Sequence, residues 1–240
     1  MKRQNFNLLV LLSVMLGISG CDTLDARRSI STEYQKQIAR IGVVSSMGDE
    51  FQFIYVGMTV FSNAQHDANV ASWNIEKVSA EQVVKMINGG GRFSAALLDR
   101  TGLDDQALSA DHAKRAWELA RLQGFDTLVV VLPNVSQNFA RFVPGYGLML
   151  HNLPLIDSKP CIYSAFTVEV MNVASQRRIA WEWGNGDRTP CEFPVKRTLD
   201  YRESMESYSS EEQKGMRDGV ISRTENEIRY ALRELNLVPE

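Results

Sequence analysis

The sequence predicts an α/β (α+β) fold: a mixed, largely antiparallel sheet of about five to seven strands, packed by two or three helices that include a long C-terminal helix. Three observations support this prediction. Apolar and alternating runs of strand length recur along the chain, segments with apolar residues at helical spacing lie between them, and residues 210–237 form the longest helical segment. The 240 residues suffice to bury a core, and we expect one domain over residues 38–240.

Three strand-like segments open this domain. Residues 38–45 form an apolar run, residues 51–61 place aromatic side chains on one face, and residues 71–78 alternate between apolar and polar side chains. The polar residues between the second and third segments predict a loop over residues 62–69. Because the three strands follow one another, we expect them to pair as a meander.

Two helices follow, separated by a segment that leaves two interpretations open. Ser79 and Gln82 form a capping-box pattern at the start of a helix that ends near Asn88, and residues 111–123 form a second amphipathic helix. Residues 93–98 between them fit a short helix or a strand equally well.

The centre of the sheet and a hairpin are predicted next. Residues 125–132 form a continuous apolar run, which is typical of a strand buried on both faces. Residues 161–183 alternate on both sides of a turn near residues 174–175, which predicts a β-hairpin. Within it Trp181 and Trp183 share one face. Core packing is the simpler interpretation of this pair, and a ligand platform is the alternative.

The C-terminal segment carries a single apolar stripe over residues 210–237, as expected of a helix that covers a sheet. Gly215 and Gly219 lie on or near the stripe. They either permit a close backbone approach or merely weaken the first turns of the helix. The stripe consists of Met216, Val220, Thr224, Ile228, Ala231, Leu232 and Leu235.

The beginning of the chain combines the features of an export signal. Lys2 and Arg3 precede an apolar core over residues 8–16 that is too short to span a bilayer as a mature helix. Ile18-Ser19-Gly20-Cys21 follows and resembles the lipobox of bacterial lipoproteins. The resemblance implies that residues 1–20 are a signal peptide and that Cys21 carries lipid. An ordinary secretory signal or an uncleaved anchor is the alternative.

Such an anchor predicts where the protein lies. Residues 21–37 are mostly polar, so we expect a tether to the cell membrane on its periplasmic face. In bacterial lipoproteins of the enteric type, an aspartate after the lipidated cysteine is associated with the inner membrane. Asp22 occupies this place, which favours the inner membrane and leaves the outer membrane open.

The charge balance excludes two classes of partner. The whole chain has a net charge of −3, and residues 1–20 contain two basic and no acidic residues, so the chain from Cys21 onward carries −5. This balance argues against binding to nucleic acid, and against binding to anionic lipid by charge alone. Attached acyl chains must therefore hold the protein at its membrane.

The two remaining cysteines predict a disulfide. Cys161 and Cys191 lie at the open end of the predicted hairpin, within a few residues of register, and an exported protein meets oxidising conditions. Closing a loop of this size contributes about 3 kcal/mol in the chain-entropy model. Two unpaired buried cysteines are the alternative.

The hairpin and the helix after it have a characteristic order. Val168-x-Val170-x-Asn172 leads through Ser175-Gln176 to Ile179-Ala180-Trp181, and the long helix follows. This order resembles that of exported bacterial domains such as the curli-secretion lipoprotein, the lipoprotein activators of penicillin-binding proteins and the amino-terminal domain of the Tol translocation protein. Members often have an acid where Asn172 stands and glycine where Gln176 stands. The resemblance implies a non-catalytic adaptor fold.

One segment between the central strand and the hairpin is a candidate binding surface. Residues 139–150 combine aromatic, glycine and aliphatic residues, a composition common at recognition surfaces. We expect it to contact another envelope protein, and a hairpin that fills the core is the alternative. The side chains expected to make this contact are Phe139, Phe142, Tyr146 and Leu148.

The favoured function is therefore a non-catalytic binding or assembly role in the bacterial cell envelope. The rival is an envelope hydrolase with a site around His112, His151 and nearby carboxylates. No phosphate loop or hydrolase motif accompanies these residues. The three histidines also lack metal-ligand spacing, so we expect no metal and no cofactor.

Overall fold

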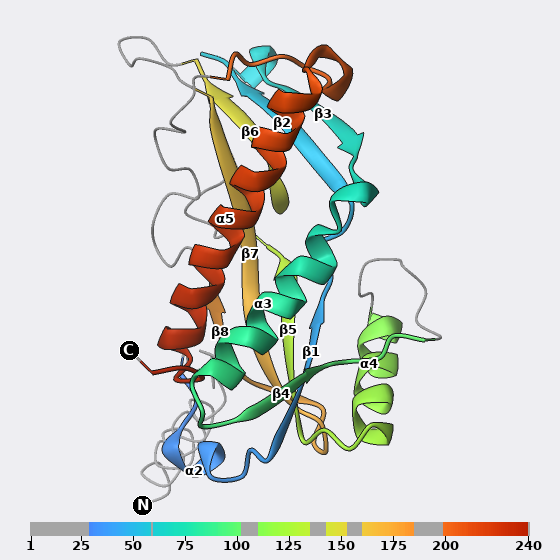
Figure 1. The fold of residues 1–240 in the computed structure, drawn as a ribbon, viewed down its shortest axis with the longest axis vertical. Helices are drawn as coiled ribbons and strands as arrows, with labels where there is room; N and C mark the ends of the chain where they lie inside the picture. The colour runs from blue at the N-terminus through green and yellow to red at the C-terminus, as the bar shows by residue number, and fades with distance from the viewer. Residues whose placement is uncertain are drawn as a thin grey trace, which may run out of the picture.

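The computed structural model describes residues 29–58, 60–101, 110–134, 143–152, 160–184 and 199–239. In these residues eight strands form one mixed sheet in the order β3-β2-β6-β7-β5-β1-β4, and β8 also pairs with β7 (Figure 1). The predicted fold class is confirmed. The strands are β1 (Arg40–Ser45), β2 (Glu50–Val56), β3 (Ala64–Asn69), β4 (Ser94–Leu97), β5 (Thr127–Pro133), β6 (Gly145–His151), β7 (Cys161–Asn172) and β8 (Arg177–Trp183).

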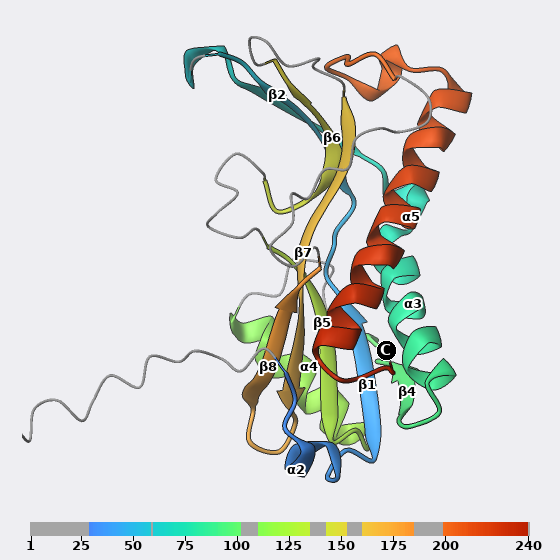
Figure 2. The same cartoon turned by 90° about the vertical axis from the view of Figure 1, so that its left-hand side faces the viewer.

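Helices cover the sheet on both faces. Figure 2 shows α3 and α5 on one face and α4 on the other. No helix in the described ranges is long and apolar enough to cross a membrane. The helices are α2 (Thr32–Gln35), α3 (Ile75–Gly89), α4 (Ala110–Leu122) and α5 (Ser210–Glu234), with short 3-10 turns η1 (Val60–Ser62), η2 (Ala71–Trp73) and η4 (Met205–Ser207).

Strand β7 joins the two halves of the sheet. Its first residues, 161–165, pair with β6, and residues 166–172 pair with β5. β8 returns antiparallel along residues 167–172, so the predicted hairpin is confirmed. The apolar run that begins at Phe125 forms β5, which lies between β1 and β7 as predicted for a central strand.

The largest core lies between the sheet and α5. Ile162, Phe166, Val168 and Val170 of β7 point toward this helix because they alternate along the strand. Every residue of the predicted α5 stripe is buried there, so the stripe is confirmed. A smaller cluster under α4 covers the opposite face, with Ala116, Ala120, Leu128 and Val130 among its members.

The expectation for the first three strands is wrong in pairing and in part of their extent. β1 pairs in parallel with β4 and β5, whereas β2 pairs with β3 and in parallel with β6, so the three strands form no meander. β2 ends at Val56, and the expected loop over residues 62–69 contains β3. β3 is polar because it is an edge strand with most of its side chains exposed, and so its sequence lacks the apolar signal of a strand.

The expected third strand is the start of a helix. Trp73 and Ile75 are both buried, but a 3-10 turn followed by the first residue of α3 brings them to the core, rather than strand alternation. Asn74 between them adopts a left-handed conformation, with φ of 53°. The helix therefore begins before Ser79, whose hydroxyl donates to the carbonyl of Ile75 at 2.7 Å.

The packed part of the chain begins earlier than expected, within the predicted tether over residues 21–37. Ile30 is buried, and its amide donates to the carbonyl of Leu235 at 3.4 Å. The Tyr34 hydroxyl lies 3.2 Å from Thr127 Oγ1 and accepts a hydrogen bond from Asn172. Helix α2 therefore closes one end of the sheet. Residues 94–97, left open between helix and strand, form β4.

The conformation of the turn between β7 and β8 accommodates both Asn172 and Gln176. Gln176 has φ of 54°, the left-handed conformation for which glycine is better suited. Asn172 Oδ1 accepts hydrogen bonds from the amide of Ser175 at 2.8 Å and from its hydroxyl at 2.9 Å. The side-chain oxygen of Asn172 therefore accepts the hydrogen bonds that a carboxylate oxygen could accept in the same turn.

The two glycines of α5 differ in their surroundings, and this generates a prediction. A Cβ at Gly215 would meet no heavy atom within 4 Å, whereas a Cβ at Gly219 would lie 3.3 Å from Ile162 Cγ1. We expect Gly215→Ala to raise the free energy of unfolding by about 1 kcal/mol through helix propensity. Gly219→Ala should raise the free energy of unfolding by less, because the side chain of Ile162 must move to make room for the new methyl group. Thermal denaturation followed by circular dichroism measures both, and an equal gain would contradict the close approach at Gly219.

Candidate functional site

The connection between β2 and β3 carries the most exposed large apolar side chain of the described residues. Phe61 is 97% exposed and Met58 is 70% exposed. We call residues 57–63 the apical loop; Thr59 within it lies outside the described residues. Figure 2 shows the β2–β3 hairpin projecting from the body of the protein. Isolated exposed apolar residues are common, but a nearly fully exposed phenylalanine on a projecting hairpin is typical of a binding surface.

The apical loop is closed by local contacts. The amide of Gly57 donates to Asn63 Oδ1 at 3.0 Å across the loop. A Cβ at Gly57 would overlap the side chain and the carbonyl of Ser62, so only glycine fits here. No residue of the loop is charged. Burial of a phenylalanine side chain in a partner would be worth about 1.5–3 kcal/mol, and no loop charge would need to be desolvated.

The segment before α5 packs on the base of this hairpin. Tyr208 stacks on Phe53 of β2, with ring centroids 5.8 Å apart and an angle of 9° between the rings. The ring of Tyr201 packs against that of Tyr55, with ring centroids 5.9 Å apart. His66 of β3 lies 3.7 Å from Glu203. The hairpin is therefore held on one face by a segment that is distant in the sequence.

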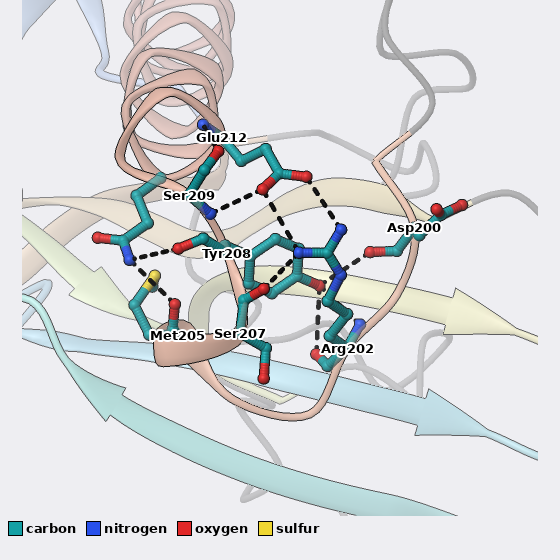
Figure 3. A network of polar contacts seen from close by, with 8 residues as sticks. Asp200, Arg202, Met205, Ser207, Tyr208, Ser209 and Glu212 are labelled. Carbon is teal, nitrogen blue, oxygen red and sulfur yellow. Dashed lines mark hydrogen bonds and ion pairs between the residues drawn. The ribbon is translucent and has the colours of Figure 1, made fainter.

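A polar network fixes that segment at the start of α5 (Figure 3). Ser209 is the N-cap, and it forms a capping box with Glu212. Arg202 donates to both carboxylate oxygens of Glu212, at 3.1 and 3.4 Å. The guanidinium of Arg202 also lies 4.8 Å from the centre of the Tyr208 ring. The hydroxyl of Tyr208 donates to the carbonyl of Asp200 at 3.0 Å, and burial raises the pKa of this hydroxyl.

A cleft of about 750 Å³ lies at a second place, where β1 and β5 end beside the first turn of α3. Crevices at the carboxyl ends of parallel strands are common ligand sites. Asp49, Glu50 and Glu76 give it acidic character, with Lys77 as a basic neighbour. Burial, followed by the charges of Asp49 and Glu50, raises the pKa of Tyr146 well above its usual range. The Tyr146 hydroxyl donates to the carbonyl of Gly48 at 2.9 Å.

Two of the residues expected to bind a partner are buried in the core. Tyr146 and Leu148 are 0% and 1% exposed, because β6 lies between β2 and β7 and these side chains point toward the main core. They offer no surface to a partner, and this part of the expectation is corrected. Phe139 and Phe142 lie outside the described residues, so for them the expectation stays a prediction.

The other predicted site residues do not converge on the cleft. His151 ends β6, with its Nε2 2.8 Å from Met149 Sδ, and the residues that line the cleft in the described ranges include no histidine. His112 lies in α4, and its side chain is outside the described residues. The described residues contain no group of three or more His, Cys, Asp or Glu residues that could hold a metal ion.

Of the predicted cysteines and tryptophans, some lie among the described residues and others do not. Cys21 and Cys191 lie outside the described residues, so lipidation and the disulfide stay predictions. Cys161 is buried at the start of β7. Trp181 and Trp183 are half-buried, with ring centroids 5.2 Å apart.

The apical loop does not stand out in the sequence, because the apolar residues of 51–61 resemble one continuous strand. Gly57 and the pair Ser62-Asn63 are turn-forming residues, and they were the available signal for a hairpin. The exposure of Phe61 could not be predicted, because its apolar neighbours resemble a continuing strand.

No family model and no curated protein sequence matches the chain. Some solved structures are similar to this chain at low sequence identity. The PelC dodecamer from Paraburkholderia phytofirmans is 12% identical, with 85% of this chain and 91% of that chain covered and a TM-score of 0.34. A DUF330 protein from Xanthomonas campestris is 8% identical, with 82% and 84% covered and a TM-score of 0.39. The LpoB C-terminal domain from Salmonella enterica is 14% identical, with 72% and 90% covered and a TM-score of 0.28.

The network at the start of α5 predicts a pH-dependent stability. Hydrogen bonds from Ser209, and then the charge of Arg202, lower the pKa of Glu212. A carboxylate with a lowered folded-state pKa stabilises the fold above its unfolded-state pKa, and this contribution is lost as the pH falls through the folded-state value. We expect Glu212→Gln to lower Tm at pH 7, and the difference from the parent to vanish in acid.

Thermal denaturation between pH 7 and pH 3 measures this difference. Glu206→Gln is the matched control, because it removes the same charge from an exposed position outside the capping box. A Tm difference for Glu212→Gln that stays constant with pH would contradict the ionic role of Glu212.

Proposed function

We propose that this chain is a lipid-anchored protein of the bacterial cell envelope, with a non-catalytic role in binding or assembling another envelope protein. The observation that carries the proposal is Phe61, 97% exposed on a projecting hairpin that a polar network braces. Rigid aromatic side chains that insert into a partner's pocket supply much of the binding energy of protein interfaces. The uncharged apical loop fits an apolar pocket on such a partner.

The proposed anchor and the apical loop belong to opposite ends of the molecule. Ser29 follows Cys21 by eight positions, so lipid on Cys21 would hold Ser29 within about 30 Å of the bilayer. Ile30 and α2 lie at the end of the long axis away from the β2–β3 hairpin (Figure 1). We infer that the apical loop points away from the membrane, where it can meet a partner in the periplasm. Asp22 favours the inner membrane for the anchor, and the proposed disulfide between Cys161 and Cys191 would restrain the start of β7.

The partner surface can be tested in cells by cross-linking. We expect the double substitution Met58→Ser and Phe61→Ser to abolish the cross-linked partner recovered with the parent chain, since both apolar contacts are lost. Leu122→Ser is the matched control, because Leu122 is 74% exposed at the end of α4, and Figure 1 shows this helix away from β2 and β3. Equal recovery of the partner by the parent and the double variant would rule out the apical loop as the binding surface.

The anchor has its own test. We expect Cys21→Ser to move the protein from the membrane fraction to the soluble periplasmic fraction, because no thiol remains for lipid attachment. Ser19→Ala, a small-residue exchange before the cysteine, serves as the control that should stay in the membrane fraction. Unchanged fractionation of Cys21→Ser would contradict the lipoprotein hypothesis.

A further inference from the structure

One end of the sheet gathers basic residues. β1, β4, β5 and β8 begin at this end and β7 ends there, as the pairs Arg40–Ser94, Ile41–Thr127 and Asn172–Arg177 show. We call it the basal face and define it as residues 29–40, 85–94, 121–127, 171–178 and 229–239. It contains nine basic and three acidic residues: Lys36, Arg40, Lys85, Arg92, Arg121, Arg177, Arg178, Arg229 and Arg233 against Glu33, Asp126 and Glu234.

The opposite end has the reverse charge. The apical loop with the start of β3, residues 56–67, and the segment 199–212 contain six acidic residues and one basic residue. The negative net charge of the chain therefore hides a separation of charge along the long axis. The acidic residues are Asp67, Asp200, Glu203, Glu206, Glu211 and Glu212, and the basic residue is Arg202.

The basic side chains are exposed, and the backbone that carries them is held in place. Lys36, Lys85, Arg121 and Arg177 are all exposed. They extend from α2, from the ends of α3 and α4, and from the start of β8, which together close the end of the sheet. The hydrogen bonds of Tyr34 to Thr127 and Asn172 tie α2 to the strands. Arg92 donates to Gln35 and links α2 to the segment after α3.

We propose that the basal face lies directly against the anionic phospholipid headgroups of the membrane that holds the lipid anchor. The inference rests on the proposed function, because the anchor is what brings this face to the bilayer. Ile30 lies within the basal face, so the chain leads from this face toward Cys21. A Lys or Arg near an anionic bilayer contributes about 1 kcal/mol, and the attraction falls off within about 8–10 Å. A face that the anchor holds near the headgroups therefore gains this attraction, and the acidic end faces away.

The charge complementarity favours lipid over a protein partner at this face. The basic residues are spread over five separate segments of one end, which suits a flat, uniformly charged surface. The contact sets the orientation of the domain, whereas the acyl chains set its residence on the membrane.

The test uses the mature chain, residues 21–240, with Cys21→Ser so that no lipid contributes to binding. Sedimentation at low ionic strength compares vesicles of phosphatidylcholine alone with vesicles that also contain phosphatidylglycerol. We expect binding only to the second kind, with weakening by added salt. The triple variant Lys85→Glu, Arg121→Glu and Arg177→Glu should bind about 100-fold more weakly, at about fivefold per basic residue removed.

A second triple variant separates position from net charge. Lys77→Glu, Lys214→Glu and Arg217→Glu change the net charge equally but lie outside the basal face, and this variant should bind within about fivefold of the parent. Circular dichroism checks that both variants are folded. Equal binding to the two kinds of vesicle, equal weakening by the two triple variants, or loss of binding through Phe61→Ser would each overturn the inference. Retention of Cys21→Ser in the membrane fraction after a high-salt wash, which removes the electrostatic contact of the basal face, would instead contradict the anchor alone.

Discussion

The structure depends on the burial of β7 on both of its faces. The first ten residues of this strand are buried, and its two halves pair with different neighbours: β6 with the first half, and β5 and β8 with the second. Helix α5 lies along one face, where Gly219 permits a close approach to Ile162. The strands that carry the apical loop or the basal face are attached to this strand directly or through one or two neighbouring strands. A cavity in β7 would therefore loosen both ends together.

The elements that the sequence predicted well are those whose burial leaves a regular pattern. The α5 stripe buries one face of its helix, and the apolar runs of β5 and β7 are buried on both faces of the sheet, so the pattern of each matches its structure. The prediction was wrong for the region from β2 to α3, because the buried residues there follow no regular spacing. β3 is a polar edge strand, and Trp73 reaches the core from a 3-10 turn, where spacing along the sequence does not report which side chain is buried.

The candidate site was predicted less well, because exposure depends on neighbours that are distant in the sequence. Tyr146 and Leu148 have a composition typical of recognition surfaces, but β2 and β7 flank them and place them in the core. Phe61 looks like a residue in a strand and is exposed because β2 has already ended. Likewise, net charge is an average over the chain, and only the register of the strands reveals that basic residues gather at one end.

If lipid on Cys21 anchors the chain as proposed, the packing of α2 against the end of the sheet makes the domain a spacer of fixed height. With lipid on Cys21, as proposed, only residues 22–29 would separate the anchor from Ile30, which is buried in the core. α5 is 25 residues long and spans about 38 Å, so the distance between the two ends is set by a rigid helix. A component that engages the hairpin would have to present its pocket at this elevation. The proposed anchor and the folded body would together select partners whose binding pocket lies at this distance from the lipid surface.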